Sequence, residues 1–225
     1  MGRLDRTEKL IGAQGLQKLR QAHVLVVGLG GVGGCVFEML ARGGIGCITA
    51  VDGDVFEESN LNRQLLATLS VLGTSKADAA AIRAKEIAPD CVVTVKRMRF
   101  TAQTADEIFS ASYSYVADCI DSVADKNALI ETCVRRNIPV ISALGAGNRT
   151  DPAFAVTDIY KTSGDGLARV LRKKLRQAGI EKLNVVCDTR QPLSVDGTPG
   201  SVSYAPNLSG CVMAQKIITD LLWNE

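Results

Sequence analysis

The chain has 225 residues and a net charge of +2, so it can form one large domain but carries no charge excess that would attract nucleic acid by itself. Its hydrophobic share of 46% is typical of a globular protein with a full core. The seven cysteines are odd in number and never spaced C-x-x-C, which argues against a disulfide framework and a paired-cysteine zinc site. No apolar run approaches the ~18 residues of a membrane span, and the first residues lack the apolar core of a signal peptide. We therefore expect a cytoplasmic protein with no membrane partner.

Helical and strand-like patterns alternate along the first two thirds of the chain. After a helical lead-in at residues 3–21, strands are predicted at 24–27, 48–51, 92–96, 115–117 and 139–141, and helices at 34–42, 75–87, 104–109 and 123–136. Such alternation is typical of an α/β fold in which a Rossmann-like, doubly wound and mainly parallel sheet carries helices on both faces.

The pattern changes from about Gly145. A loop at 145–152 precedes a strand at 155–160, a helix at 167–177, a strand at 183–187 and an amphipathic helix at 208–223. Residues 191–207 are rich in Pro and Gly, and a crossover loop of this length is a candidate for a mobile, functional segment. We expect one domain over residues 1–225, with a nucleotide-binding core at 1–144 and a substrate-facing C-terminal extension at 145–225.

A glycine-rich turn follows the first predicted strand. It contains Gly28, Gly30, Gly31 and Gly33 and opens the next helix. Asp52 ends the following strand about 20 residues later, where a carboxylate can bind a ribose. A tight structural turn is the alternative, but the strand–turn–helix context favours phosphate binding by backbone N–H groups at the helix N-terminus.

A polar loop continues from this strand, with candidate nucleotide contacts at Asp54, Ser59, Asn60, Arg63 and Gln64. Any one of these side chains alone is most simply a solvated loop residue. Together their charges and amides suit a triphosphate and metal better than a nicotinamide cofactor. Their order resembles the nucleotide loop of the ubiquitin-activating-type adenylyltransferases (ThiF, MoeB and HesA), which include bacterial enzymes that activate sulfur-carrier proteins.

The resemblance implies ATP and Mg²⁺ as cofactors and assigns four further roles. Lys76, in Gly73-Thr-Ser-Lys76, and Arg63 would neutralise the triphosphate, and Asp121, in Ala117-Asp-Cys-Ile-Asp121-Ser, would coordinate the metal. Arg6 resembles the arginine that such enzymes contribute across a dimer interface, which implies a homodimer.

One branch of this superfamily matches the second half of the chain. Residues 139–152, 156–162 and 165–176 resemble the tRNA threonylcarbamoyladenosine dehydratases, which use ATP to cyclise a side chain on an anticodon-loop adenosine. The resemblance covers about residues 3–190, and it implies a tRNA partner and an acyl-adenylate intermediate. A basic stripe at helical spacing, which could follow an RNA backbone or be an ordinary solvated face, comprises Arg169, Arg172, Lys173 and Arg176.

Two cysteines and three rival functions complete the expectations. Cys187 resembles a cysteine of the dehydratases and is either a reactive thiol or an inert buried one, and Cys211 is expected in the core. A sulfur-relay protein is a further candidate partner. A rival enzyme would adenylate the C-terminal glycine of a ubiquitin-like sulfur carrier, but the missing C-x-x-C pairs weigh against it. A non-catalytic nucleotide-binding scaffold is a second rival. A nicotinamide oxidoreductase is least favoured, because no hydride-transfer site is visible.

Overall fold

A single sheet of seven strands forms the centre of the molecule, which a computed structural model describes over residues 2–223; Met1, Asn224 and Glu225 of the predicted domain 1–225 lie outside the described residues. The strands are β1 His23–Val27, β2 Cys47–Val51, β3 Val92–Lys96, β4 Tyr115–Asp118, β5 Val140–Ala143, β6 Phe154–Asp158 and β7 Asn184–Asp188. Their order is β3-β2-β1-β4-β5-β7-β6, and β6 is antiparallel to β7 whereas the other pairs are parallel. The prediction of a mainly parallel sheet is confirmed.

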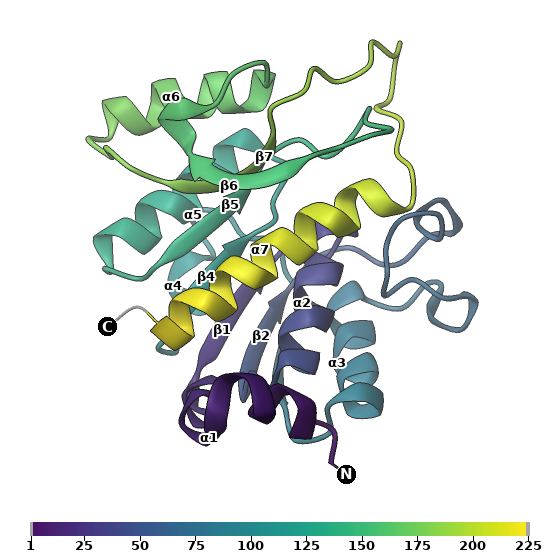
Figure 1. Cartoon of the computed structure of the whole chain (residues 1–225). Coiled ribbons are helices and arrows are strands. Elements are labelled where there is room, and N and C mark those ends of the chain that lie inside the picture. Colours follow the sequence, from purple (N-terminus) through teal and green to yellow (C-terminus); the bar gives the residue numbers. More distant parts are fainter. Residues whose placement is uncertain (1, 224–225) are drawn as a thin grey trace.

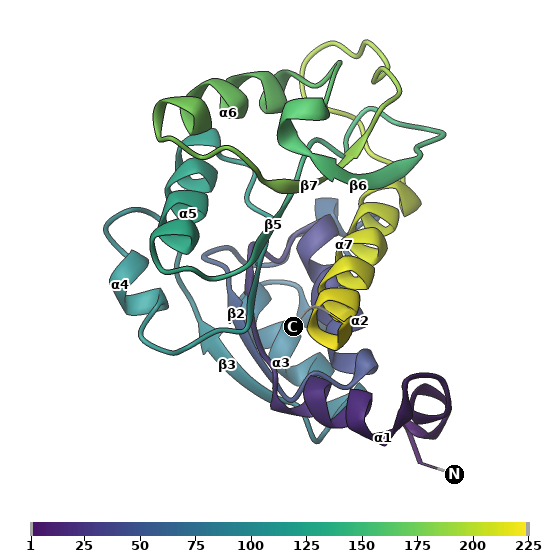
Figure 2. The ribbon, with the colours of Figure 1, turned by 60° about the vertical axis from the view of Figure 1, so that its left-hand side comes forward.

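Helices cover both faces of this sheet (Figures 1 and 2). They are α1 Asp5–Gln21, α2 Gly31–Gly43, α3 Lys76–Ile87, α4 Ala105–Ile108, α5 Val123–Arg135, α6 Gly166–Gln177 and α7 Tyr204–Trp223, with 3-10 turns η1 Glu58–Asn60, η2 Leu69–Val71 and η3 Ile159–Lys161. Helices α2, α3 and α7 pack on one face, and α4, α5 and α6 pack on the other. The doubly wound arrangement predicted from the sequence is therefore confirmed.

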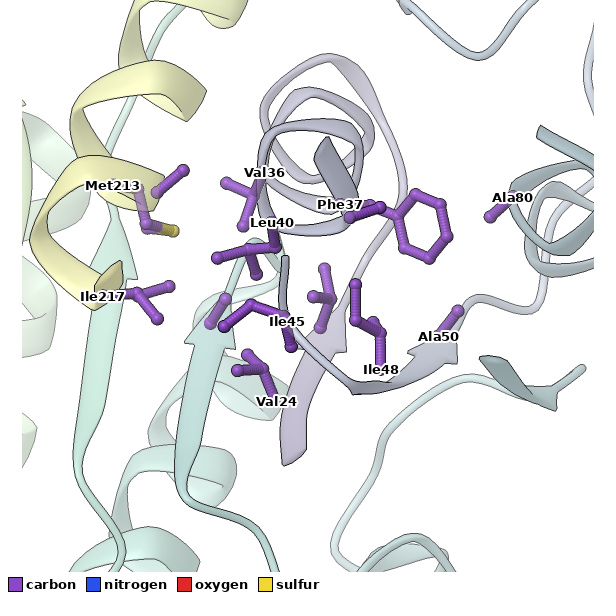
Figure 3. Packing of buried hydrophobic residues seen from close by; sticks show 14 of the residues in the cluster. Val24, Val36, Phe37, Leu40, Ile45, Ile48, Ala50, Ala80, Met213 and Ile217 are labelled. Carbon is purple, nitrogen blue, oxygen red and sulfur yellow. The ribbon is translucent and has the colours of Figure 1, made fainter. Parts of the chain in front are cut away.

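The largest hydrophobic core lies between the sheet and α2, α3 and α7 (Figure 3). Phe37 and Leu40 of α2 and Met213 and Ile217 of α7 are fully buried in it. The two helices approach closely, because a Cβ on Gly210 of α7 would lie only 2.7 Å from the Val32 carbonyl oxygen. The last helix of the chain is thus fixed against the helix that follows the glycine turn.

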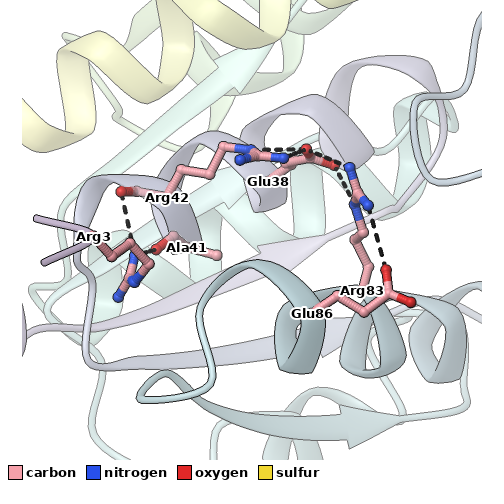
Figure 4. A network of polar contacts seen from close by, with 6 residues as sticks. All are labelled: Arg3, Glu38, Ala41, Arg42, Arg83 and Glu86. Carbon is pink, nitrogen blue, oxygen red and sulfur yellow. Dashed lines mark hydrogen bonds and ion pairs between the residues drawn. The ribbon is translucent and has the colours of Figure 1, made fainter.

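One buried carboxylate joins α2 to α3 on this face (Figure 4). The Glu38 side chain is 4% exposed and accepts hydrogen bonds from Arg42 and Arg83 at 2.6–3.1 Å. Burial raises the pKa of Glu38, but the hydrogen bonds from Arg83 and Arg42 outweigh it, so the pKa lies below its ordinary value. Arg3 donates to the carbonyl oxygens of Ala41 and Arg42 and so attaches the N-terminal segment to the end of α2.

Two expectations for the closing helix are wrong. The helix begins at Tyr204, not Leu208, because Pro206 lies in its first turn, where a missing N–H breaks no hydrogen bond. Cys211 is exposed, not in the core. No helix among residues 2–223 has the length and apolar character needed to cross a membrane.

The strand order reverses between β1 and β4, and this places a crevice at the carboxyl ends of those strands. β1 pairs with β2 on one side and with β4 on the other. In open parallel sheets, ligands bind at such a switch point. The glycine turn follows β1, and the segment with Asp121 follows β4, so both predicted features meet there.

Candidate nucleotide-binding site

A pocket of about 600 Å³ lies at the switch point. Its walls come from the glycine turn after β1, the loops after β2, β3 and β4, the first turns of α3 and α7, and two loops of the second half of the chain. Nine of the predicted contacts line it: Gly28, Gly30, Gly31, Asp52, Asp54, Arg63, Gln64, Lys76 and Asp121. The volume is within the usual range for a site that encloses a small ligand.

The glycine turn depends on the absence of side chains at two positions. Gly28 has φ +88°, and a Cβ there would lie 2.8 Å from the Cys119 carbonyl oxygen. A Cβ on Gly33 would lie 1.8 Å from the Gly28 carbonyl oxygen. Gly33 therefore does not line the pocket but lets α2 begin close to the turn, with its N-terminal N–H groups available to an anion.

Asp52 ties the glycine turn to the end of β2. One carboxylate oxygen accepts the Leu29 N–H at 2.7 Å and the other accepts the Asp54 N–H at 2.8 Å. The carboxylate retains acceptor capacity, since each oxygen has two lone pairs, and it lines the pocket. The same side chain can hold the turn and accept a hydrogen bond from a ribose hydroxyl.

Two cations contact Asp54, which lies two residues after Asp52 in the same loop. Arg99 donates to Asp54 at 2.8 Å, and Lys76 Nζ lies 3.7 Å from the other carboxylate oxygen. The Arg99 hydrogen bond is the main reason that the pKa of Asp54 is lowered. Lys76 begins α3 and is only 8% exposed, so its ammonium is restricted to the pocket wall. Arg99 also lines the pocket, and no sequence motif indicated it.

The segment from Ser59 to Gln64 divides into supporting and lining residues. Asn60 is buried and caps η1 through the Glu57 N–H at 3.2 Å, and the Ser59 carbonyl accepts from Arg63 at 2.8 Å. Asn60 and Ser59 do not line the pocket, whereas Arg63 and Gln64 do. Gln64 is 7% exposed, and its Oε1 has no hydrogen-bond partner among the described residues. A buried amide oxygen without a partner is available to a ligand.

A buried ion pair supports the loop after β4. Lys126 Nζ lies 2.8 Å from Asp118 Oδ2, and Ser142 donates to the same oxygen at 2.7 Å. Asp118 Oδ1 accepts the Ile120 N–H at 3.1 Å, which fixes the backbone one residue before Asp121. Asp121 itself is exposed to the pocket. Lys126 is thus a structural residue of the site that no motif in the sequence indicated.

Two further walls were not predicted. Met98 and Phe100 follow β3, and their position could have been inferred, because residues after a parallel strand lie at the same edge of the sheet. The loops at 146–147 and 198–201 also line the pocket. The length and the Pro and Gly content of residues 191–207 predict a functional loop, but no local motif indicates that residues 198–201 contact the pocket.

The model of the ThiF family matches residues 4–223, nearly the whole of the described chain. The chain belongs to the ThiF family. Its sequence is 37% identical to tRNA threonylcarbamoyladenosine dehydratase of Bacillus subtilis, over 97% of this chain and 94% of that protein. The enzyme of the same name from Escherichia coli is 40% identical, over 95% of this chain and 79% of that protein.

Solved structures of related proteins superpose on this chain. The crystal structure of the E. coli dehydratase, TcdA, in complex with ATP superposes with a TM-score of 0.93 at 37% identity, over 98% of this chain and 93% of that one. E. coli MccB in complex with ATP superposes with a TM-score of 0.71 at 20% identity, over 98% of this chain and 63% of that one, and shares the fold.

The other predicted residues of this ThiF-family chain lie outside the pocket lining. Arg6 is exposed on α1. Helix α1 lies at the end of the sheet where β1 begins (Figure 1). Cys187 is 3% exposed, packs in the core beneath α6, and has its pKa raised by burial. Both features of Cys187 fit the inert thiol better than the reactive one.

The basic stripe on α6 is divided by the structure. Arg169 and Lys173 are exposed. Arg172 is half-buried and donates to the Thr162 carbonyl at 3.0 Å, and the Arg176 guanidinium lies 5.1 Å from the Tyr160 ring centroid. Arg172 and Arg176 therefore have partners within the protein, although Arg176 is exposed as Arg169 and Lys173 are.

Proposed function

We propose that this chain is an ATP-dependent tRNA threonylcarbamoyladenosine dehydratase. The observation that carries the proposal is one pocket in which a glycine turn, Arg63, Lys76 and Asp121 meet. Arg and Lys beside a helix N-terminus suit a triphosphate. The dehydratases of B. subtilis and E. coli, similar over most of their length, support the choice of substrate.

The reaction begins with activation of a carboxylate. The threonyl carboxylate of the substrate attacks the α-phosphorus of ATP, pyrophosphate leaves, and an acyl-adenylate forms. An internal carbamoyl oxygen or nitrogen then displaces AMP and closes the ring, so that one water is lost in total. Because the closure is intramolecular, positioning and charge neutralisation by Arg63 and Lys76 supply most of the rate, and no protein nucleophile is needed.

Asp121 suits a magnesium ion that accompanies the nucleotide. No three His, Cys, Asp or Glu side chains within residues 2–223 converge on a metal site of their own. Mg²⁺ in nucleotide sites needs only one or two carboxylates, with phosphate and water oxygens completing the shell. Asp121 offers such a carboxylate at the pocket wall. When bound, the ion would neutralise charge on the pyrophosphate leaving group.

The proposal includes a homodimer in which Arg6 reaches the pocket of the partner. Its support is the family resemblance together with the position of Arg6, exposed and outside the pocket of its own chain. Mixing inactive Arg6→Ala and Arg63→Ala proteins tests it, because mixed dimers would contain one intact site. We expect about a quarter of wild-type activity to return after subunit exchange. If the mixed proteins have exchanged subunits and still show no activity, Arg6 does not contribute to the partner's site.

The basic face of α6 is proposed to contact tRNA, chiefly through Arg169 and Lys173. Both side chains are exposed and lie one helical turn apart on α6. A sulfur-relay partner stays a prediction based on resemblance alone. A cytoplasmic location stays a prediction from the sequence.

Pyrophosphate exchange separates the proposal from its enzymatic rival. Labelled pyrophosphate should enter ATP when the protein, ATP and Mg²⁺ are supplied with tRNA carrying the modified adenosine. Unmodified tRNA is the control and should give none. Exchange that depends instead on a ubiquitin-like protein with a C-terminal glycine would replace the proposed function by carrier activation. Nucleotide binding without exchange under either condition would favour the scaffold.

A further inference from the structure

A short segment of the long loop between β7 and α7 forms part of the pocket wall. Residues Thr198–Ser201, here called the strap, line the pocket together with Ala146 and Gly147. Every residue from 191 to 200 is exposed, and none belongs to a helix or strand. Of the four strap residues only Ser201 is half-buried, so the strap depends chiefly on hydrogen bonds for its position.

Asn148 supplies most of these bonds. Its Oδ1 accepts the Gly200 N–H at 2.6 Å, and its own N–H donates to the Gly200 carbonyl at 2.8 Å. Its carbonyl oxygen accepts the Leu193 N–H at 2.8 Å, at the other end of the same loop. Asn148 has φ +57°, in the left-handed region that Asn adopts more readily than most residues. This backbone turn directs the side chain and main chain of one residue to the same partner.

The loop that carries Asn148 and the Ser201 end of the strap are held by separate contacts. Next to Asn148, Arg149 forms a buried ion pair with Asp188 at 3.0 Å and donates to the Gly145 carbonyl. Asn62, the neighbour of Arg63, donates to the Ser201 carbonyl at 3.2 Å. The strap thus spans the pocket between a rigid loop on one side and the Arg63 segment on the other.

We infer that Asn148 is a positioning residue, which holds the strap as the wall along which the acceptor carboxylate approaches the nucleotide. The inference rests on the proposed function. The glycine turn, Asp52, Lys76 and Arg63 supply the phosphate- and ribose-binding groups, and they all come from the first 76 residues. The strap and residues 146–147 form another part of the wall, and this part lacks charged side chains, unlike the parts that carry Arg99 and Asp121. An acceptor in line with the departing pyrophosphate needs a fixed surface on that side.

Three variants separate the hydrogen bond from the backbone turn. Asn148→Gly removes the side chain but tolerates the left-handed φ, and Asn148→Asp retains both the turn and an acceptor oxygen. Asn137→Gly is the matched control, because Asn137 is the other non-glycine residue with positive φ (+53°) among residues 2–223 and forms no side-chain hydrogen bond within them. Asn137 lies after α5 and does not line the pocket.

Hydrogen–deuterium exchange of a peptide that contains Gly200 measures, without any activity assay, how firmly Asn148 holds the strap. In Asn148→Gly we expect this peptide to exchange about fivefold faster, in line with the loss of one hydrogen bond. The Kd for ATP should change less than twofold, while kcat/KM for modified tRNA should fall about tenfold. Asn148→Asp and Asn137→Gly should resemble wild type in all three measurements.

Equal exchange rates of the Gly200 peptide in Asn148→Gly and Asn137→Gly would contradict the claim that Asn148 holds the strap. Faster exchange with unchanged kcat/KM for tRNA would overturn the positioning role. If the wild-type protein itself does not dehydrate the tRNA, the proposed function fails and the acceptor role of the strap fails with it, whereas exchange of the Gly200 peptide still decides whether Asn148 holds the strap.

Discussion

Lys76 and Asp54 lie side by side in the pocket wall, with Lys76 Nζ 3.7 Å from Asp54 Oδ2. The backbone N–H of Lys76 also donates to the Asp54 carbonyl at 2.9 Å, so the start of α3 is joined to the loop after β2. The cation proposed to reach the triphosphate is therefore placed by the same loop that carries Asp52. Arg99 shares Asp54 with Lys76, so the carboxylate does not fully neutralise the Lys76 ammonium, which stays available to a phosphate in the pocket.

Lys76→Met tests this cation, because Met retains the apolar stem and removes only the charge. We expect kcat to fall about 10²–10³-fold through the loss of phosphate neutralisation. Lys85→Met is the control, since Lys85 lies on the same helix, is exposed and does not line the pocket. Steady-state kinetics should show this fall in kcat for Lys76→Met and a kcat close to that of wild type for Lys85→Met. Equal activity would remove Lys76 from the catalytic residues.

Gly33→Ala should abolish nucleotide binding or folding, because the added methyl would lie 1.8 Å from the Gly28 carbonyl oxygen. Gly166→Ala is the matched control: it begins α6, its Cβ would meet nothing within 4 Å, and Ala favours helix. Thermal unfolding and ATP titration should show a large loss for the first variant and a change of less than about 1 kcal/mol in unfolding free energy for the second. ATP binding of wild-type strength in Gly33→Ala would contradict the turn geometry.

The buried pair of Asp118 and Lys126 should respond differently to single and double substitution. Lys126→Ala leaves the Asp118 carboxylate unpaired in the core and should cost about 3–5 kcal/mol of unfolding free energy. The double variant Asp118→Leu with Lys126→Met should regain most of this stability. It should still lose activity, because Ile120 no longer has its acceptor and the loop of Asp121 is released. Urea unfolding with ATP turnover measures both, and a fully active double variant would refute the supporting role.

Glu38 should make stability depend on pH in the acid range. Its folded-state pKa lies below the ordinary value, so the unfolded chain binds more protons there and stability falls as pH drops below about 4.5. Glu38→Gln should lose about 2–3 kcal/mol at pH 7 and should flatten the acid limb of the stability curve. Glu86→Gln is the control, because Glu86 contacts the same Arg83 but its side chain is 63% exposed. Identical acid limbs in the two variants would argue against the Glu38 network.

Substitutions on α6 should distinguish RNA binding from structural support. Arg169→Ala and Lys173→Ala should each weaken tRNA binding at unchanged thermal stability. Each should also reduce the slope of log K against log salt by about one, because one fewer phosphate is neutralised. Arg172→Ala should in addition lower the melting temperature, because Arg172 donates to the Thr162 carbonyl. Unchanged tRNA affinity in the Arg169→Ala Lys173→Ala double variant would exclude this face.

Much of the fold was predictable because the local patterns agree with it. The apolar runs that become β1, β2 and β4 end where glycines or aspartates begin, and parallel strands bring those ends to one edge. The pattern places the start of α7 four residues late, because Pro206 is typical of a loop, whereas Pro is also tolerated in the first turn of a helix.

The site was predictable only where chemistry is local. Asp52 follows β2, Lys76 begins α3 and Arg63 lies in the loop between them, so their meeting follows from topology. The sequence predicts Asn60 as a ligand contact, but the structure uses it to cap η1. Contact of the strap with the pocket depends on Asn148, about 50 residues earlier in the chain. Sequence spacing cannot predict that two loops so far apart form hydrogen bonds with each other.

The mass of the modified nucleoside is the most direct test of the proposed function. tRNA carrying threonylcarbamoyladenosine is incubated with the protein, ATP and Mg²⁺. The tRNA is then digested, and the masses of its nucleosides are measured by mass spectrometry. We expect the nucleoside to lose the mass of one water, with one AMP formed for each, and Lys76→Met to leave it unchanged. A nucleoside of unchanged mass, from wild-type protein that binds ATP, would contradict the proposal.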